Sequence, residues 1–99
     1  MRIKVSGEAA QEILDAAAWY EERRAGLGAQ FKEACDCAFE HIAKNPAGHL
    51  HVGKGFHRYL MSRFPFVVFY ETRGEVLIVA AVIHGARNPL HWRQRLGLE

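Results

Sequence analysis

Two apolar segments joined by a short turn constrain the fold more than any other part of the sequence. Residues 66–72 and 75–84 are apolar or aromatic over most of their length, and Arg73-Gly74 between them suits a two-residue hairpin turn. A strand with one face in water alternates apolar and polar residues, whereas these segments carry apolar side chains on both faces. They therefore predict two central strands, covered by helices on one face and by other side chains or a tail on the other.

The residues before this hairpin predict a third strand. Residues 56–63 form that strand, and it ends at a corner at Phe64-Pro65, because proline lacks the N–H that a central strand donates. Within the hairpin, the expected register places Tyr70 opposite Leu77.

The N-terminal part predicts a short strand followed by an amphipathic helix. Residues 2–5 alternate polar and apolar, Ser6 is a suitable N-cap, and Gly26 ends the helix. The apolar face of this helix has helical spacing and consists of Ala10, Ile13, Leu14, Ala17 and Tyr20.

A second amphipathic helix follows after only a tight connection. Its apolar positions are Phe31, Cys35, Ala38 and Ile42, and Asn45-Pro46 ends it, because proline disfavours helical geometry in the residue before it. Two helices with so short a link are expected to form an antiparallel hairpin.

The remaining segments complete an α+β domain with the order β-α-α-β-β-β-α over residues 1–99. Residues 46–55 predict a loop rich in glycine and histidine, whose spacing matches no metal motif, so no metal and no cofactor is expected. A final short helix is expected from Asn88-Pro89 to Arg95. The expected architecture is a small antiparallel sheet with an added N-terminal strand, packed on a helical hairpin.

Composition excludes several classes of protein. A hydrophobic fraction of 49% and a charged fraction of 24% are typical of a globular domain. The longest apolar run is too short to span a bilayer and no secretory signal is evident, so a cytoplasmic protein without membrane contact is expected. Cys35 and Cys37 point to opposite sides of their helix and are expected to be free thiols.

Charge is distributed unevenly along the chain. Residues 1–53 carry a net charge of −2, and residues 54–99 carry +4. A basic half favours an anionic partner such as RNA, DNA or an acidic protein segment. An ordinary solvated surface is the alternative at this modest charge.

Three polar residues follow the ends of the predicted strands. Arg63, His84 and Arg87 are expected to gather at one edge of the sheet, whereas Arg58 begins its strand at the other end. Arginine binds phosphate bidentately, and histidine transfers protons near neutral pH, so the three residues suit metal-independent cleavage of a phosphodiester. A solvated rim with a strand-end histidine is the alternative interpretation of the same residues.

Several short motifs, in their order along the chain, resemble those of the RelE/ParE toxin superfamily. They are Ala16-Ala17-Ala18-Trp19-Tyr20-Glu21, Gly26-Leu27-Gly28 with Phe31, Asn45-Pro46, Arg63-Phe64-Pro65-Phe66 with Val68 and Tyr70, and His84-Gly85-Ala86-Arg87-Asn88-Pro89 with Trp92 and Arg95. The pattern is nearer to ParE-like, plasmid-stabilisation members. The resemblance implies the toxin of a type II toxin–antitoxin pair, with a neutralising antitoxin of the ribbon-helix-helix type as partner.

The resemblance implies two different mechanisms. ParE-like members inhibit DNA gyrase by binding it, whereas RelE-like members are ribosome-dependent mRNA endonucleases. The first implies a target-binding or phosphate-binding surface made of Arg58, Arg63, Arg87, Arg93 and Arg95. The second implies catalytic roles for Arg63, His84 and Arg87, although the tail after Arg87 has no tyrosine. A toxin fold with decayed activity is a third possibility.

Overall fold

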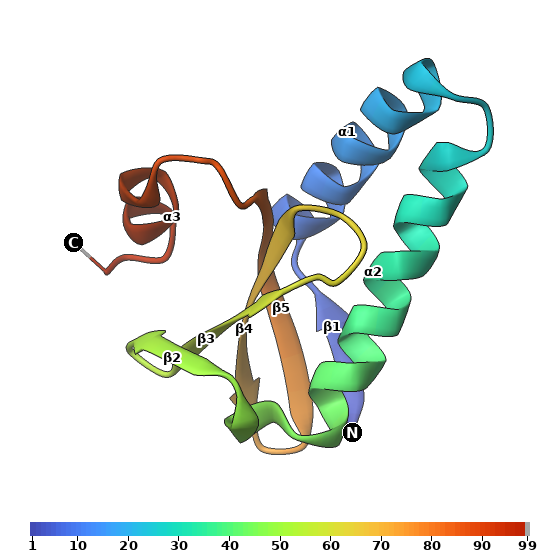
Figure 1. The fold of residues 1–99 in the computed structure, drawn as a ribbon. Helices are drawn as coiled ribbons and strands as arrows, with labels where there is room; N and C mark the ends of the chain where they lie inside the picture. The colour runs from blue at the N-terminus through green and yellow to red at the C-terminus, as the bar shows by residue number, and fades with distance from the viewer. Residues whose placement is uncertain (99) are drawn as a thin grey trace.

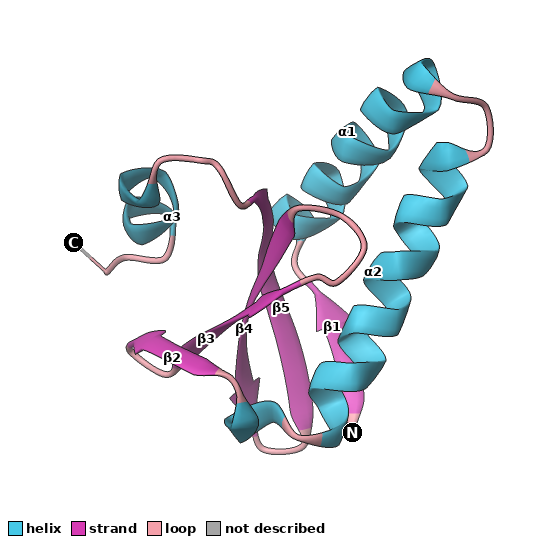
Figure 2. Ribbon diagram, in the orientation of Figure 1, coloured by secondary structure: helices cyan, strands magenta, loops and turns pink. Residues whose placement is uncertain are grey.

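The computed structural model describes residues 1–98 and has three layers (Figure 1). Helices α1 and α2 form a hairpin on one face of a five-stranded sheet, and α3 lies against the other face (Figure 2). In chain order the elements are β1 (Arg2–Val5), α1 (Gly7–Arg23), α2 (Leu27–Lys44), the 3₁₀ turn η1 (Pro46–Gly48), β2 (Leu50–Gly53), β3 (Phe56–Leu60), β4 (Phe66–Arg73), β5 (Val76–His84) and α3 (Pro89–Arg95). Of the helices within residues 1–98, none has the length and apolar character needed to cross a membrane.

The sheet has the strand order β1-β5-β4-β3-β2. Strand β1 runs parallel to β5, and the other neighbours are antiparallel. The predicted α+β class is therefore confirmed, with an N-terminal strand added to an antiparallel meander and packed on a helical hairpin.

The helix boundaries follow from local capping chemistry. The Ser6 side chain accepts a hydrogen bond from Ala9 N–H and caps α1, as predicted, and Asn88 caps α3 in the same way. Between α1 and α2, the Glu21 carboxylate accepts hydrogen bonds from the N–H groups of Gly26 and Gly28, which lower the pKa of Glu21.

The face of the sheet under α1 and α2 holds the main core. Phe31 of α2 is fully buried and packs edge-on against Phe64 and Phe66, with ring centroids 5.2 and 4.9 Å away. Tyr20 of α1 stacks on Phe31 at 5.4 Å. Burial raises the pKa of the Cys35 thiol, a member of the same core, to about 12, so this thiol is an inert core residue.

The opposite face of the sheet carries a smaller apolar cluster. Its buried members are Val67, Phe69, Ala81 and Ile83, and α3 covers them in part. The Trp92 ring lies 4.8 Å from that of Phe69. Other side chains or a tail were expected on this second face of the central strands, and the structure places both there, Val52 from β2 with Trp92 and Leu96 from the C-terminal segment.

The sequence-based register of the central hairpin is wrong. Tyr70 pairs with Val79, and Leu77 pairs with Thr72, with an irregularity at Phe69/Tyr70. The turn residues are Gly74 and Glu75, because Gly74 has a φ of 59° and takes the first central position, where a type II′ turn requires glycine.

Two further expectations need correction. The segment predicted as a loop contains the short edge strand β2, which sequence patterns miss because Leu50–Gly53 has no run of β-branched or aromatic residues. Leu14 lies outside the core, with 51% of its surface exposed, and Ala9 is buried in its place.

Candidate functional site

The corner after β3 and the end of β5 meet at one edge of the sheet, as topology predicted. Phe66 pairs with His84, and Gly85 N–H donates a 2.7 Å hydrogen bond to the Pro65 carbonyl. The backbones that carry Arg63 and His84 are therefore neighbours. Their side chains take different directions.

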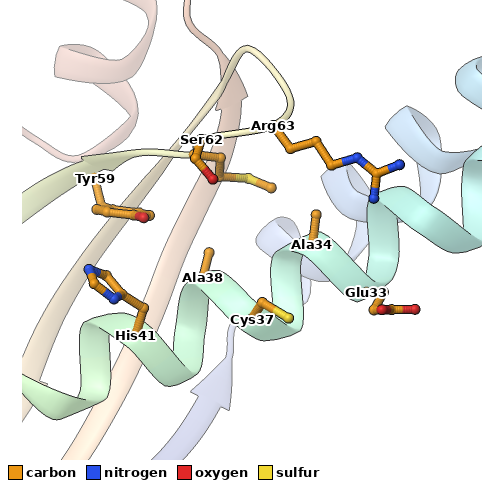
Figure 3. A pocket seen from close by; sticks show the side chains of 9 residues that line it. Glu33, Ala34, Cys37, Ala38, His41, Tyr59, Ser62 and Arg63 are labelled. Atoms are coloured by element: carbon orange, nitrogen blue, oxygen red, sulfur yellow. The ribbon is translucent and has the colours of Figure 1, made fainter.

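Arg63 points towards α2. Its guanidinium donates to the Gln30 side chain and lines a cavity of about 330 Å³ between α2 and the segment that follows β3 (Figure 3). His41 and Tyr59 close the other end of this cavity.

A larger cavity of about 560 Å³ lies between α1 and the end of β5. Its apolar lining includes Trp19, Tyr20 and Phe66, and its polar lining includes His84 and Arg87. Trp19 is 51% exposed although it is aromatic, so this cavity presents a hydrophobic surface to solvent.

A narrow cleft of about 50 Å³ separates α3 from the sheet, and it brings together residues that were expected at opposite ends of the sheet. Arg58, His84 and Arg87 all line this cleft, together with Phe69 and Trp92. Arg58 faces α3 because it pairs with Phe69 in the sheet, and its guanidinium lies 5.9 Å from the Phe69 ring. The structure thus groups His84 and Arg87 with Arg58, whereas Arg63 lines the cavity beside α2.

The His84 side chain has a defined orientation. Its Nδ1 atom accepts a 3.0 Å hydrogen bond from the Ala86 N–H, which requires the neutral tautomer with the proton on Nε2. The ring packs edge-on against Phe66 with 5.2 Å between centroids. Nε2 is therefore the nitrogen that His84 can offer to a ligand.

Arg95, expected on the target-binding surface, instead connects α3 to the rest of the fold. Its guanidinium makes a 2.6 Å ion pair with Glu12 and a 3.3 Å ion pair with Glu8, and it donates to the Ala80 carbonyl. Hydrogen bonding to Glu12 raises the pKa of Arg95. The same Glu12 carboxylate accepts from Val82 N–H, so this pair also caps the edge of β5 beyond the end of β1.

Arg93 makes a local contact in the C-terminal segment. Its guanidinium donates a 3.1 Å hydrogen bond to the Leu98 carbonyl, and it lies 5.8 Å from the Trp92 ring. The arginines expected to form one surface therefore divide into a pair at the cleft, Arg58 and Arg87, and three that contact other parts of the fold.

Four histidines, His41, His49, His51 and His57, form a row near the C-terminal end of α2, although their spacing in the sequence matches no metal motif. His41 and His49 have ring centroids 5.7 Å apart, and His51 and His57 are 5.1 Å apart. Among residues 1–98, no group of three or more histidine, cysteine or carboxylate side chains is arranged to hold a metal ion.

Comparison with known proteins assigns the fold to a family. A family model described as the ParE toxin of the type II toxin–antitoxin system parDE matches residues 3–89. The chain belongs to the ParE toxin family. A type II toxin–antitoxin system implies an antitoxin partner, and the sequence resemblance to ParE-like toxins is confirmed.

A solved structure supports the same fold. The chromosomal ParDE system from P. aeruginosa contains a chain that superposes with a TM-score of 0.64 over 85% of this ParE toxin and 95% of that chain, at 17% sequence identity. At this identity the similarity concerns the fold alone. No curated protein matches the sequence significantly.

Proposed function

We propose that this ParE toxin acts by binding DNA gyrase through the α3 side of its sheet, and that its antitoxin neutralises it by occupying the adjacent larger cavity. The observation that carries the proposal is that the cleft beneath α3 and the cavity beside α1 share His84 and Arg87. An antitoxin segment in the cavity would therefore cover two residues that the target needs.

The α3 side of the sheet has the chemistry of a protein-binding surface. Leu50, Leu60 and Leu90 are 66, 58 and 48% exposed. Leu50 pairs with Arg58 and Leu60 with Val67, two residues that line the cleft, and Leu90 belongs to α3. None of the ion pairs formed within the described residues involves Arg58 or Arg87, so both cations are available to a partner. Exposed leucines next to unpaired arginines favour an acidic and partly apolar protein surface as the target.

The larger cavity suits the antitoxin because it adjoins the end of the β5 edge, beyond the positions that Glu12 and Arg95 bind. Val82 N–H points away from β4 towards Glu12, so the Val82 carbonyl and the His84 N–H face the same side. An extended antitoxin segment would add to this edge through its backbone and place an apolar side chain against Trp19 and Phe66. The match to the ParE toxin model supports an antitoxin as the occupant.

A gyrase supercoiling assay with purified toxin tests the target. The wild-type toxin is expected to inhibit supercoiling, and Arg58→Ala and Arg87→Ala are each expected to be at least about tenfold weaker, because each removes a charge from the cleft. Arg73→Ala is the matched control, since Arg73 is an exposed arginine at the β4–β5 turn. Normal supercoiling at excess wild-type toxin would exclude gyrase as the target.

The site of antitoxin binding has a separate test. Trp19→Ala is expected to keep the growth arrest caused by the toxin and to weaken rescue by the co-expressed antitoxin, because Trp19 lines the cavity but not the cleft. Full rescue of this variant, with unchanged affinity for the purified antitoxin, would place the antitoxin elsewhere. Absence of growth arrest by the wild-type toxin would instead favour a fold with decayed activity.

One observation favours an mRNA endonuclease as the second candidate. His84 has its Nε2 free and lines the cleft together with Arg58 and Arg87, which is a suitable set for proton transfer and phosphate binding. This candidate predicts codon-register mRNA cleavage on ribosomes that is lost in His84→Gln. Intact mRNA during growth arrest would rule it out.

A further inference from the structure

The histidine row, defined as His41, His49, His51 and His57, connects the end of α2 to the β2–β3 hairpin. Two tyrosines fill the spaces between its rings. The His49 ring lies 5.0 Å from that of Tyr59, and the His57 ring stacks on Tyr70 at 5.4 Å. Protonation of one histidine therefore changes the electrostatic surroundings of the others.

The surroundings of the row do not compensate an added positive charge. No ion pair formed by residues 1–98 involves a histidine, so no carboxylate neutralises an imidazolium in the row. Two further cationic residues belong to the segments that carry the row, Lys44 in the last turn of α2 and Lys54 in the hairpin turn.

The hairpin turn depends on a neutral His51. Its Nε2 atom accepts a 3.2 Å hydrogen bond from the Gly55 N–H, and a protonated imidazole cannot accept it. The turn between β2 and β3 is conformationally unfavourable, since Lys54 has a φ of 51° between two glycines with positive φ. Lys54 Nζ also donates to the Gly97 carbonyl, which connects the turn to the segment after α3.

We propose that the histidine row is an acid-sensitive switch. Its protonation loosens the β2–β3 hairpin, and because Arg58 belongs to β3, it also loosens the cleft between Arg58 and α3. The groups that face the row are His41 from α2, His57 and Tyr59 from β3, and Tyr70 from β4. Burial raises the pKa of Tyr70 to about 12, so this phenol stays neutral and keeps its 2.5 Å hydrogen bond to the Pro46 carbonyl. Histidine is the side-chain type that gains a proton just below neutral pH, so the row and not Tyr70 supplies the change of charge. The proposal does not depend on the identity of the toxin's target.

The pKa of His49 determines whether acid stabilises or destabilises the folded state. Burial, and then the charges of His41 and His57, lower the pKa of His49 below its ordinary value of 6.5. The folded state thus favours neutral His49, and its contribution to stability is complete above the unfolded pKa. This contribution is lost as the pH falls below about 6.5 and through the folded pKa.

The experiment is an NMR titration of the wild-type toxin from about pH 7.5 to about pH 5. The amide signals of Gly55 and Arg58 are expected to shift or broaden in step with the His49 ring signals, and the protection of Gly55 N–H against exchange is expected to fall about tenfold. The amide of Leu77, in the main core, is the internal reference and should not follow the titration. Unchanged Gly55 and Arg58 signals down to about pH 5 would overturn the proposal.

A pair of histidine variants separates the row from general acid effects. His49→Gln is expected to reduce the response of the hairpin amides to acid by at least about half, because the central member of the row no longer gains a charge. His91→Gln, on α3, is the matched control and should respond as the wild type does. An equal response in His49→Gln and in wild type would also overturn the proposal, and the wild-type titration decides if this variant does not fold.

Discussion

The two faces of the sheet are built differently. Under α1 and α2, aromatic rings from both helices and from the corner before β4 form a closed core around the fully buried Phe31. Under α3, a smaller cluster is covered mainly by Trp92 and Leu96, while Leu60 on the same face is 58% exposed. The face under α1 and α2 therefore contributes most of the stability, and the α3 side combines partial burial with available charge.

This difference fits the proposed division of the domain into a face that stabilises the fold and a face that binds the target. Among the described residues, the cluster under α1 and α2 has fourteen buried members and the cluster under α3 has four. An exposed leucine costs little stability, because much of the surface of any folded protein is apolar. The α3 side can therefore present Leu60, Arg58 and Arg87 to a partner without weakening the fold.

The largest expected effect is a truncation in the main core. Phe31→Ala is expected to lower the free energy of unfolding by about 3–5 kcal/mol, because it removes a buried ring and leaves a cavity among Tyr20, Phe64 and Phe66. Urea unfolding measures this loss. Trp92→Ala on the opposite face is the comparison, and a loss as large as that of Phe31→Ala would contradict the difference between the faces.

A second test concerns how closely α1 and α2 approach. A Cβ atom at Gly28 would lie 2.6 Å from the Ala17 carbonyl oxygen, so Gly28→Ala must push the helices apart. We expect a loss of about 2 kcal/mol in the free energy of unfolding. Gly7→Ala, at the start of α1, is the matched control because a Cβ there meets no atom within 4 Å. Equal stability of the two variants would indicate a loosely packed hairpin.

The contacts that attach α3 to the fold are expected to contribute less to the free energy of unfolding than the core under α1 and α2. Arg95→Met is expected to cost about 1–2 kcal/mol, because the partly buried Glu12 loses its cationic partner. Hydrogen exchange of the α3 amides should increase while exchange in α2 stays unchanged. Arg73→Met is the control, since the Arg73–Glu71 pair is exposed on the arginine side and should contribute little. A uniform increase of exchange in all helices would show that Arg95 stabilises the whole fold instead.

Local patterns predicted the elements better than their pairing. Ser6 and Asn88 were identifiable as caps because capping depends on a few neighbouring residues. The register was not identifiable, because the predicted partner of Tyr70 and its real partner, Val79, differ by two residues. A shift of two keeps the side chains on the same face, so the apolar pattern between Tyr70 and the turn cannot distinguish the two registers. At Phe66 the shift is three, because Phe66 was expected opposite Ala81 and pairs with His84, and the irregularity at Phe69/Tyr70 adds the extra residue.

The candidate site was also predicted only in part, because strand ends can be located from local patterns and distant contacts cannot. His84 and Arg87 lie close together, as expected from their position at the end of β5. The direction of the Arg63 side chain was not predictable for two reasons. Arg63 lies beyond Leu60, the last residue of β3, so strand alternation no longer sets its direction. Its guanidinium also donates to Gln30, which is distant in the sequence. Arg58 was a candidate from the sequence, but it was expected at the other end of the sheet from His84 and Arg87. The structure brings the three together because Arg58 pairs with Phe69 and lies on the α3 side.

The smallest expected change in stability is also the sharpest test of the comparison. Leu60→Ser is expected to leave the free energy of unfolding within about 0.5 kcal/mol of wild type, because Leu60 is already 58% exposed. Val67→Ser, its partner in the sheet on the same face, should cost at least about 2 kcal/mol because Val67 is 2% exposed. In the gyrase assay, Leu60→Ser should inhibit several-fold less than wild type. If the Leu60→Ser variant unfolds more readily, Leu60 belongs to the core. If the variant also inhibits gyrase fully, the α3 side is not the proposed binding surface.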